Sequence, residues 1–339
     1  MKLATLLVSA ALAFGTEPAA HAAALPLAGS VQRESPALDR LIAPGVRVEK
    51  VAEGLTWAEG PVWVRGGGYL LLSDVPENMM YRWSPRTGLS MFLKPSGYAG
   101  SDTGIFREDG SNGLFPSDRP GAILMADSGS RAIARLDLST KAKTFLATRY
   151  KGKKFNSPND LVLARDGSIW FTDPPYGLKD LDKSPARELR FNGVYRLMPG
   201  GEVRLIDDRL TFPNGIVLSP DERTLYVSQS DPANALIYAY TLNRLGKVIG
   251  RRVFADMTAL VKQGLSGLPD GMCIDRQGNL FASGPGGIHV LSPTGRELGL
   301  IRTETTSANC AFGEDGRTVF IASTHSLLRI RTRTKGLGF

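Results

Sequence analysis

Four oxygen-bearing side chains recur at one spacing in this chain, and their chemical types suit a hard metal ion. Each lies seven residues before a tight-turn residue and within two residues of a proline; they are Glu59, Asn159, Asn214 and Asp270. Carboxylate and amide oxygens, without His or Cys, form the ligand set of Ca²⁺ before Mg²⁺ or Mn²⁺. Zn²⁺ stays open as a further alternative. The spacing therefore predicts one metal site assembled from four distant parts of the chain.

The competing interpretation is that these residues only build turns. Asn and Asp beside Gly and Pro are ordinary turn residues, and for any single position that explanation is the simpler one. Four occurrences at a constant spacing favour the metal site. If the four converge, two buried carboxylates would repel each other and lose hydration, and a bound cation would remove that problem.

The elements that would position these side chains belong to a repeated unit. Each unit reads as a polar residue, a short apolar strand, a tight turn and a second strand. Three copies are clear and three are weaker, and they span Ser157–Asp173, Phe212–Ser230, Leu268–Gly284, Ala58–Asp74, Ser111–Asp127 and Ser307–Ser323. A second strand pair follows five of the six copies. Four short strands per unit, repeated at intervals of roughly 40 to 55 residues, are typical of propeller blades.

The two chain ends complete the fold. The sixth unit lacks its last strand, and the alternating segment Val46–Val51 precedes the first unit. We therefore predict an all-β, six-bladed propeller of four-stranded blades, closed by an N-terminal strand that joins the last blade. A pair of β-sandwiches is the structural alternative. The predicted organisation is a signal peptide at 1–22, a lead segment at 23–44, the propeller at 45–335 and a C-terminal tail at 336–339.

Two segments do not fit the repeat. Asp256–Gly264 has the pattern of a short helix between units. Pro95–Gly110 is Gly-rich, lacks a strand pattern and is inserted between the first and second units. We expect it to form a loop that covers the mouth of the propeller's central channel.

The N-terminus and the charge distribution indicate where the protein works and which partners it can bind. One Lys, a short apolar run and small residues ending at Ala22 predict a cleavable leader, so we expect an exported, periplasmic protein. The run is shorter than the ~20 residues of a spanning helix, which argues against a membrane anchor. The net charge is +8 with scattered basic residues and no nucleic-acid motif, so nucleic acid is excluded as a partner.

The two cysteines, Cys273 and Cys310, lie in separate apolar strand segments. Export would permit a disulfide between them, but each thiol could equally be a small buried apolar group, which we favour. After cleavage only His289 and His325 remain, so a His-based zinc site would have few ligands.

Several motifs carry a resemblance to a known family. EGPVW, NSPNDLV, FTDPPYG, FPNGIVLSPD and PDGMCID stand in the order found in the senescence-marker-protein, gluconolactonase and luciferin-regenerating-enzyme-like family. The resemblance implies a six-bladed propeller that hydrolyses lactones with a divalent metal. It implies that Glu59, Asn159 and Asn214 are metal ligands, and that Asp270 is a ligand and the catalytic base. The insertion and the segment ADSGSR (Ala126–Arg131) depart from the family pattern.

The predicted function is that of a metal-dependent, gluconolactonase-like hydrolase acting on a small lactone. The metal would polarise the carbonyl while Asp270 takes a proton from the attacking water; direct attack by Asp270 is the alternative. Asn112 would orient substrate hydroxyls, and Asp173 and Tyr176 would contact the substrate unless they only cap an Asp-Pro-Pro turn. Two other functions stay open, a phosphotriesterase or fluorophosphatase of the same fold and a non-catalytic exported propeller that binds metal or sugar.

Overall fold

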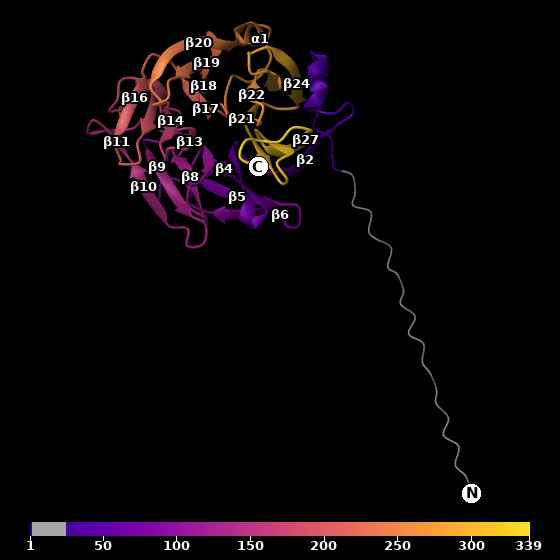
Figure 1. The fold of residues 1–339 in the computed structure, drawn as a ribbon. Helices are drawn as coiled ribbons and strands as arrows, with labels where there is room; N and C mark the ends of the chain where they lie inside the picture. The colour runs from indigo at the N-terminus through magenta and orange to yellow at the C-terminus, as the bar shows by residue number, and fades with distance from the viewer. Residues whose placement is uncertain (2–24) are drawn as a thin grey trace.

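The computed structural model describes residue 1 and residues 25–339, so the predicted leader at 1–22 lies almost entirely outside the described residues. Within them the strands form six sheets of four or five strands and one two-stranded hairpin. The six sheets are arranged in a ring (Figure 1), and their innermost strands contact one another all round its axis. The predicted six-bladed propeller is confirmed.

The first three blades follow the predicted units, each running from the channel outward. Blade one contains β3 (Ala58–Val64), β4 (Tyr69–Asp74), β5 (Met79–Ser84) and β6 (Gly88–Leu93). Blade two contains β7 (Leu114–Pro116), β8 (Ala122–Asp127), β9 (Ala132–Asp137) and β10 (Lys143–Ala147). The hairpin of β11 (Arg149–Tyr150) and β12 (Lys153–Lys154) comes next. Blade three contains β13 (Leu161–Leu163), β14 (Ile169–Asp173), β15 (Gly193–Leu197) and β16 (Val203–Asp207).

Of the last three blades, five and six each include a strand from the N-terminal region. Blade four contains β17 (Pro213–Leu218), β18 (Thr224–Asp231), β19 (Asn234–Leu242) and β20 (Val248–Asp256). Blade five contains β21 (Met272–Ile274), β22 (Leu280–Gly284), β23 (Gly287–Leu291), β24 (Glu297–Thr303) and, outermost, β1 (Gly29–Arg33). Blade six contains β25 (Ser307–Gly313), β26 (Thr318–Ser323), β27 (Ser326–Arg331) and β2 (Val48–Glu53).

The N-terminal region closes the ring and also does more than we predicted. β2 pairs antiparallel with β27, which confirms the closing strand two residues beyond the predicted start. β1 pairs with β24 and makes a fifth strand on blade five. Because β1 lies inside the segment 23–44, part of the predicted lead segment belongs to the propeller. Both strands cover an outer edge that would otherwise be unpaired.

An apolar layer fills the junction between each pair of neighbouring blades. The layer between blades two and three includes aromatic side chains, among which Phe171 and Tyr195 stack with ring centres 5.2 Å apart. Because apolar side chains fill the space between the blades, buried polar side chains can gather along the central channel.

The remaining elements are short. The predicted helix at Asp256–Gly264 contains α1 (Thr258–Lys262), and 3₁₀ turns span Pro36–Arg40, Arg65–Gly67 and Leu181–Lys183. Pro95–Gly110 is a loop, as predicted, with one isolated bridge from Phe106 to Leu178. None of the helices in the described part of the chain has the length and apolar character needed to cross a membrane.

Candidate active site

All four predicted metal ligands line one chamber at one end of the channel, with a volume of about 320 Å³. They lie at or just before the start of an innermost strand in blades one, three, four and five. Side chains at this level converge because the innermost strands surround the axis. Asn112 of blade two and Tyr176 also line the chamber.

Close approach of neighbouring blades explains the glycine that follows three of the four ligands. A Cβ atom on Gly215, next to Asn214, would lie 2.3 Å from the backbone oxygen of Asp270. Only glycine fits there without displacing the backbone. The narrow ring holds the side chains of successive blades near one another.

Hydrogen bonds turn the amide of Asn214 toward the chamber. Its Nδ2 donates to Ser230 Oγ at 2.9 Å, and Ser230 Oγ donates in turn to Pro269 O at 2.6 Å. Because the amide nitrogen is already used, the Asn214 oxygen is the atom left for a ligand. This is the orientation that metal binding requires.

Glu59 is held by the neighbouring sixth blade. Its Oε2 accepts hydrogen bonds from Gly60 N at 2.9 Å and from Asn309 Nδ2 at 3.2 Å. The amide oxygen of Asn309 accepts from Cys310 N at 2.8 Å. Asn309 therefore positions Glu59 and has its own oxygen occupied, although it stands at nearly the same place in its unit as the predicted ligands.

Among residues 25–339, no positively charged side chain pairs with either carboxylate of the ring. Burial raises the pKa of Glu59 to about 7. The pKa of Asp270 is raised well above its ordinary value by burial and then by the negative charge of Glu59. Asp270 Oδ1 is buried and has no hydrogen-bond partner among the described residues. Two close buried acids with an orphaned oxygen and two amides fit a divalent cation.

The cation would depend on the amides. No group of three or more His, Cys, Asp and Glu side chains that could hold a metal occurs in the described ranges. Two carboxylates alone would leave a divalent ion short of the six to eight oxygens that Ca²⁺ prefers. The amide oxygens of Asn159 and Asn214 would supply part of the difference.

The predicted substrate contacts divide into two groups. Asn112 lines the chamber, as does Tyr176, whose ring stacks on Phe212 with centres 5.8 Å apart. The Tyr176 hydroxyl is buried without a hydrogen-bond partner among the described residues, and burial raises its pKa. Asp173 is not among the lining residues; it is completely buried and accepts from Asn156 N at 2.8 Å. Asp173 therefore lies outside the chamber in this structure, and its role as a substrate contact stays a prediction beside the turn-capping alternative.

Two residues of the insertion also line the chamber, and the sequence pattern did not single them out. Arg107 and Glu108 form an ion pair at 2.9 Å, and both backbone N–H groups donate to Gly177 O. The Arg107 side chain is 53% exposed, whereas burial raises the pKa of Glu108. The insertion therefore reaches the mouth of the chamber, as predicted, and adds one charge of each sign to its wall.

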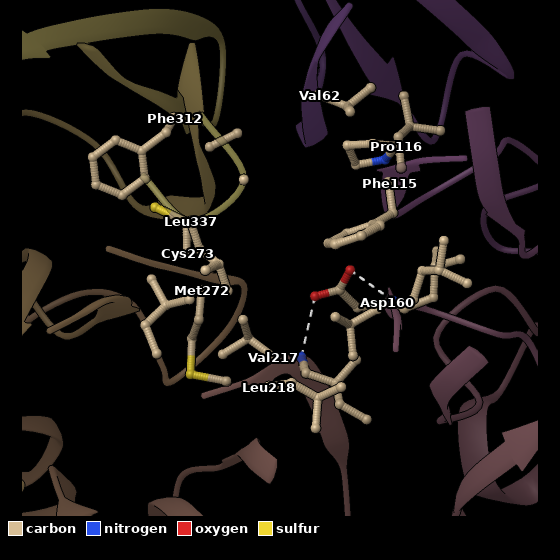
Figure 2. Close-up of a pocket in the computed structure, with 18 of the residues that line it drawn as sticks. Val62, Phe115, Pro116, Asp160, Val217, Leu218, Met272, Cys273, Phe312 and Leu337 are labelled. Atoms are coloured by element: carbon tan, nitrogen blue, oxygen red, sulfur yellow. Dashed lines mark hydrogen bonds between the residues drawn. The ribbon is translucent and has the colours of Figure 1, made fainter. Parts of the chain in front are cut away.

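A further carboxylate, Asp160, lies on the far side of the ring. Its oxygens accept from Leu161 N at 2.9 Å and Ile216 N at 3.2 Å, and burial raises its pKa to about 7. The carboxylate projects into a second, largely apolar cavity of about 420 Å³ (Figure 2). The C-terminal residues Leu337 and Phe339 also line this cavity, so the tail lies at the other end of the channel.

The chain is a closed six-bladed propeller with a ring of carboxylates and amides at one end of its channel. It therefore belongs to the class of propellers whose candidate binding site lies on the central axis. Residues 57–325 match the family described as the SMP-30/Gluconolactonase/LRE-like region, and the chain belongs to that family. The resemblance carried by the sequence motifs is thereby confirmed.

Individual relatives match between 71% and 91% of this chain. A gluconolactonase of Zymomonas mobilis is 48% identical over 312 residues, which is 91% of this chain and 87% of that protein. A solved gluconolactonase structure from Xanthomonas campestris is 32% identical, with a TM-score of 0.77 over 91% of this chain and 98% of that one. The diisopropyl-fluorophosphatase of Loligo vulgaris is 25% identical over 71% of this chain and 76% of its own length.

Proposed function

We propose that this protein is a lactone hydrolase of the gluconolactonase type, and that it uses a divalent metal held in the chamber. The observation that carries the proposal is the pair of buried carboxylates, Glu59 and Asp270. They share one chamber with Asn159 and Asn214, and no described residue supplies a positive partner. The similarity to two gluconolactonases over almost the whole chain supports the substrate class.

Asp270 acts as the general base in this proposal. Its Oδ1 has no hydrogen bond to give up, so it is available to accept a proton from a water molecule that attacks the lactone carbonyl carbon. Its backbone is fixed by Ser228 Oγ, which donates to Asp270 O at 2.8 Å. A fixed base next to a defined chamber holds the attacking water in line with the carbonyl.

A divalent cation, for which Ca²⁺ is our first choice, would be held by Glu59, Asn159, Asn214 and Asp270, where it would polarise the lactone carbonyl and offset the repulsion between the two carboxylates. Glu59 is kept in place by Asn309, and Asn214 by Ser230. These supporting hydrogen bonds orient the ring before substrate arrives.

Neighbouring side chains would recognise the sugar. Tyr176 keeps its proton because burial raises its pKa, so its hydroxyl is a donor for a substrate oxygen. Asn112 offers an amide on the same wall, and Arg107 offers a half-exposed donor at the mouth. Together they suit a small polyhydroxylated lactone better than an apolar ester.

A substrate panel tests the proposal. Proton release from D-glucono-1,5-lactone, an aromatic lactone and a phosphotriester is followed with Ca²⁺ present, and the spontaneous rate is subtracted. The sugar lactone should be hydrolysed fastest, at least about tenfold above the others, since only it presents hydroxyls to the polar wall. Hydrolysis of the phosphotriester at an equal or greater rate would instead assign the chamber to the fluorophosphatase alternative.

A further inference from the structure

The two cysteines of the chain, which are 37 positions apart, come together in the channel. Cys273 Sγ and Cys310 Sγ lie 2.8 Å apart. A disulfide bond is about 2.05 Å long, so a shift of less than about 1 Å would bring the sulfurs to bonding distance. Both residues are free thiols in this structure.

The contact follows from how blades five and six meet. Cys273 lies on β21 and Cys310 on β25, the innermost strands of the two blades. Two residues before each cysteine, Gly271 N donates to Ala308 O at 2.7 Å. Side chains repeat every second residue along a strand, so the same stagger that joins Gly271 to Ala308 places the two thiols side by side. The pair is therefore held by backbone contacts between the blades.

The surroundings make one thiol accessible and the other not. Cys273 is partly exposed, whereas Cys310 is buried with its Sγ 3.3 Å from Phe281 O. Both line the apolar cavity at the far end of the channel, where Figure 2 places Cys273 beside Met272. A small reagent that enters this cavity meets Cys273 first.

We propose that Cys273 and Cys310 form an oxidisable pair, which a small disulfide or a thiol–disulfide oxidoreductase converts into a bond between blades five and six. The Cys273 thiol loses its proton, attacks one sulfur of the reagent and releases the first reagent thiol. Cys310 loses its proton, attacks the Cys273 sulfur and releases the second. Two cysteine thiols are oxidised, and one reagent disulfide is reduced to two thiols.

The bond would form at the far end of the channel, but it would join two segments that also hold residues of the catalytic site. Cys310 follows Asn309, which positions Glu59, and Cys273 lies three residues after Asp270. The leader proposed at residues 1–22 would carry the chain to an oxidising compartment, where such a bond persists. The inference does not rest on the proposed activity, because it concerns the two strands and not the substrate.

Thiol counting tests the proposal on the full chain. The protein is reduced, freed of reductant, treated with oxidised glutathione, denatured and alkylated. Alkylated cysteines should fall from two to none, and peptide mapping should join the segments that contain Cys273 and Cys310. The oxidised protein should also unfold roughly 5 °C higher than the reduced protein, because the bond closes a loop in the unfolded chain.

Two single variants sharpen the test. Cys310→Ser should hold one glutathione on Cys273 and gain no thermal stability, whereas Cys273→Ser should react slowly because its remaining thiol is buried. Two free thiols after oxidation, glutathione on both cysteines of the wild type, or bonds between two chains would each overturn the proposal. The wild-type comparison decides the matter alone if a variant does not fold.

Discussion

Replacing Asp270 by Asn separates catalysis from folding at this site. The change removes the proposed base while keeping the side-chain volume, and the anchoring bonds to Ser228 and Ser283 use only backbone atoms of residue 270. It also removes a buried acid whose pKa is raised by burial and by the negative charge of Glu59. The metal-free variant should therefore be at least as stable as the metal-free wild type.

The expected fall in kcat follows from the proposed role of Asp270 as general base. A positioned general base contributes about 10²- to 10⁴-fold to rate, so kcat for sugar-lactone hydrolysis should fall by that factor. This corresponds to about 3–5 kcal/mol in activation free energy. The side chains proposed to recognise the sugar, Tyr176, Asn112 and Arg107, are unchanged in this variant, so KM should change far less than kcat.

A second acid of the same channel supplies the matched control. Both oxygens of Asp160 accept backbone N–H groups, and an amide can replace only one of those acceptors. Asp160→Asn should therefore lower stability by about 1–3 kcal/mol and leave kcat within about tenfold of wild type. Proton-release kinetics and thermal unfolding of both variants form the assay. If Asp270→Asn keeps kcat within tenfold of wild type, Asp270 is not the base.

Three further outcomes follow from the same structure. Burial raises the pKa of Glu59 from 4.5 to about 7, so the unfolded chain releases this proton at a lower pH than the folded chain does. Between those pH values the free energy of unfolding of the chelated protein should fall by up to about 3 kcal/mol as the pH rises. In unfolding scans the Glu59→Gln variant should show a smaller fall over the same range. Arg107→Ala should raise KM for a sugar lactone about tenfold with little effect on kcat or melting temperature, because the side chain is half exposed at the chamber mouth; an unchanged KM would exclude it from substrate binding. Removal of residues 1–33 deletes β1 and uncovers β24, which should lower stability by roughly 3 kcal/mol and promote association in light scattering; equal stability would show that the fifth strand is dispensable.

The fold could be predicted because every blade repeats one strand and turn pattern. Aligning the repeats also predicted that four side chains would meet, because they occupy the same position in their units and so lie at one level of the axis. These side chains are Glu59, Asn159, Asn214 and Asp270. β1 was missed because it is a five-residue strand outside the repeat, and only the exposed edge of β24 gives it a partner.

The remaining parts of the site depend on contacts between units, which the spacing within one unit does not contain. Asn309 occupies nearly the same position in its repeat as the predicted ligands do. The contact between blades six and one, however, directs its amide to donate a hydrogen bond to Glu59. Asp160 carried a weak signal, because it is acidic where four other units have Gly and the sixth has Cys. Arg107 and Glu108 lie in an insertion without periodicity, so only the folded loop shows that they reach the chamber.

The central claim is that a divalent ion in the chamber is required for lactone hydrolysis. Its most direct test is to strip the protein of metal with a chelator, remove the chelator, and titrate Ca²⁺ while following hydrolysis of D-glucono-1,5-lactone. Our account predicts that the stripped protein hydrolyses the lactone at the spontaneous rate, and that activity returns and saturates at a single ion per chain. Full activity in the stripped protein before any Ca²⁺ is added would contradict it.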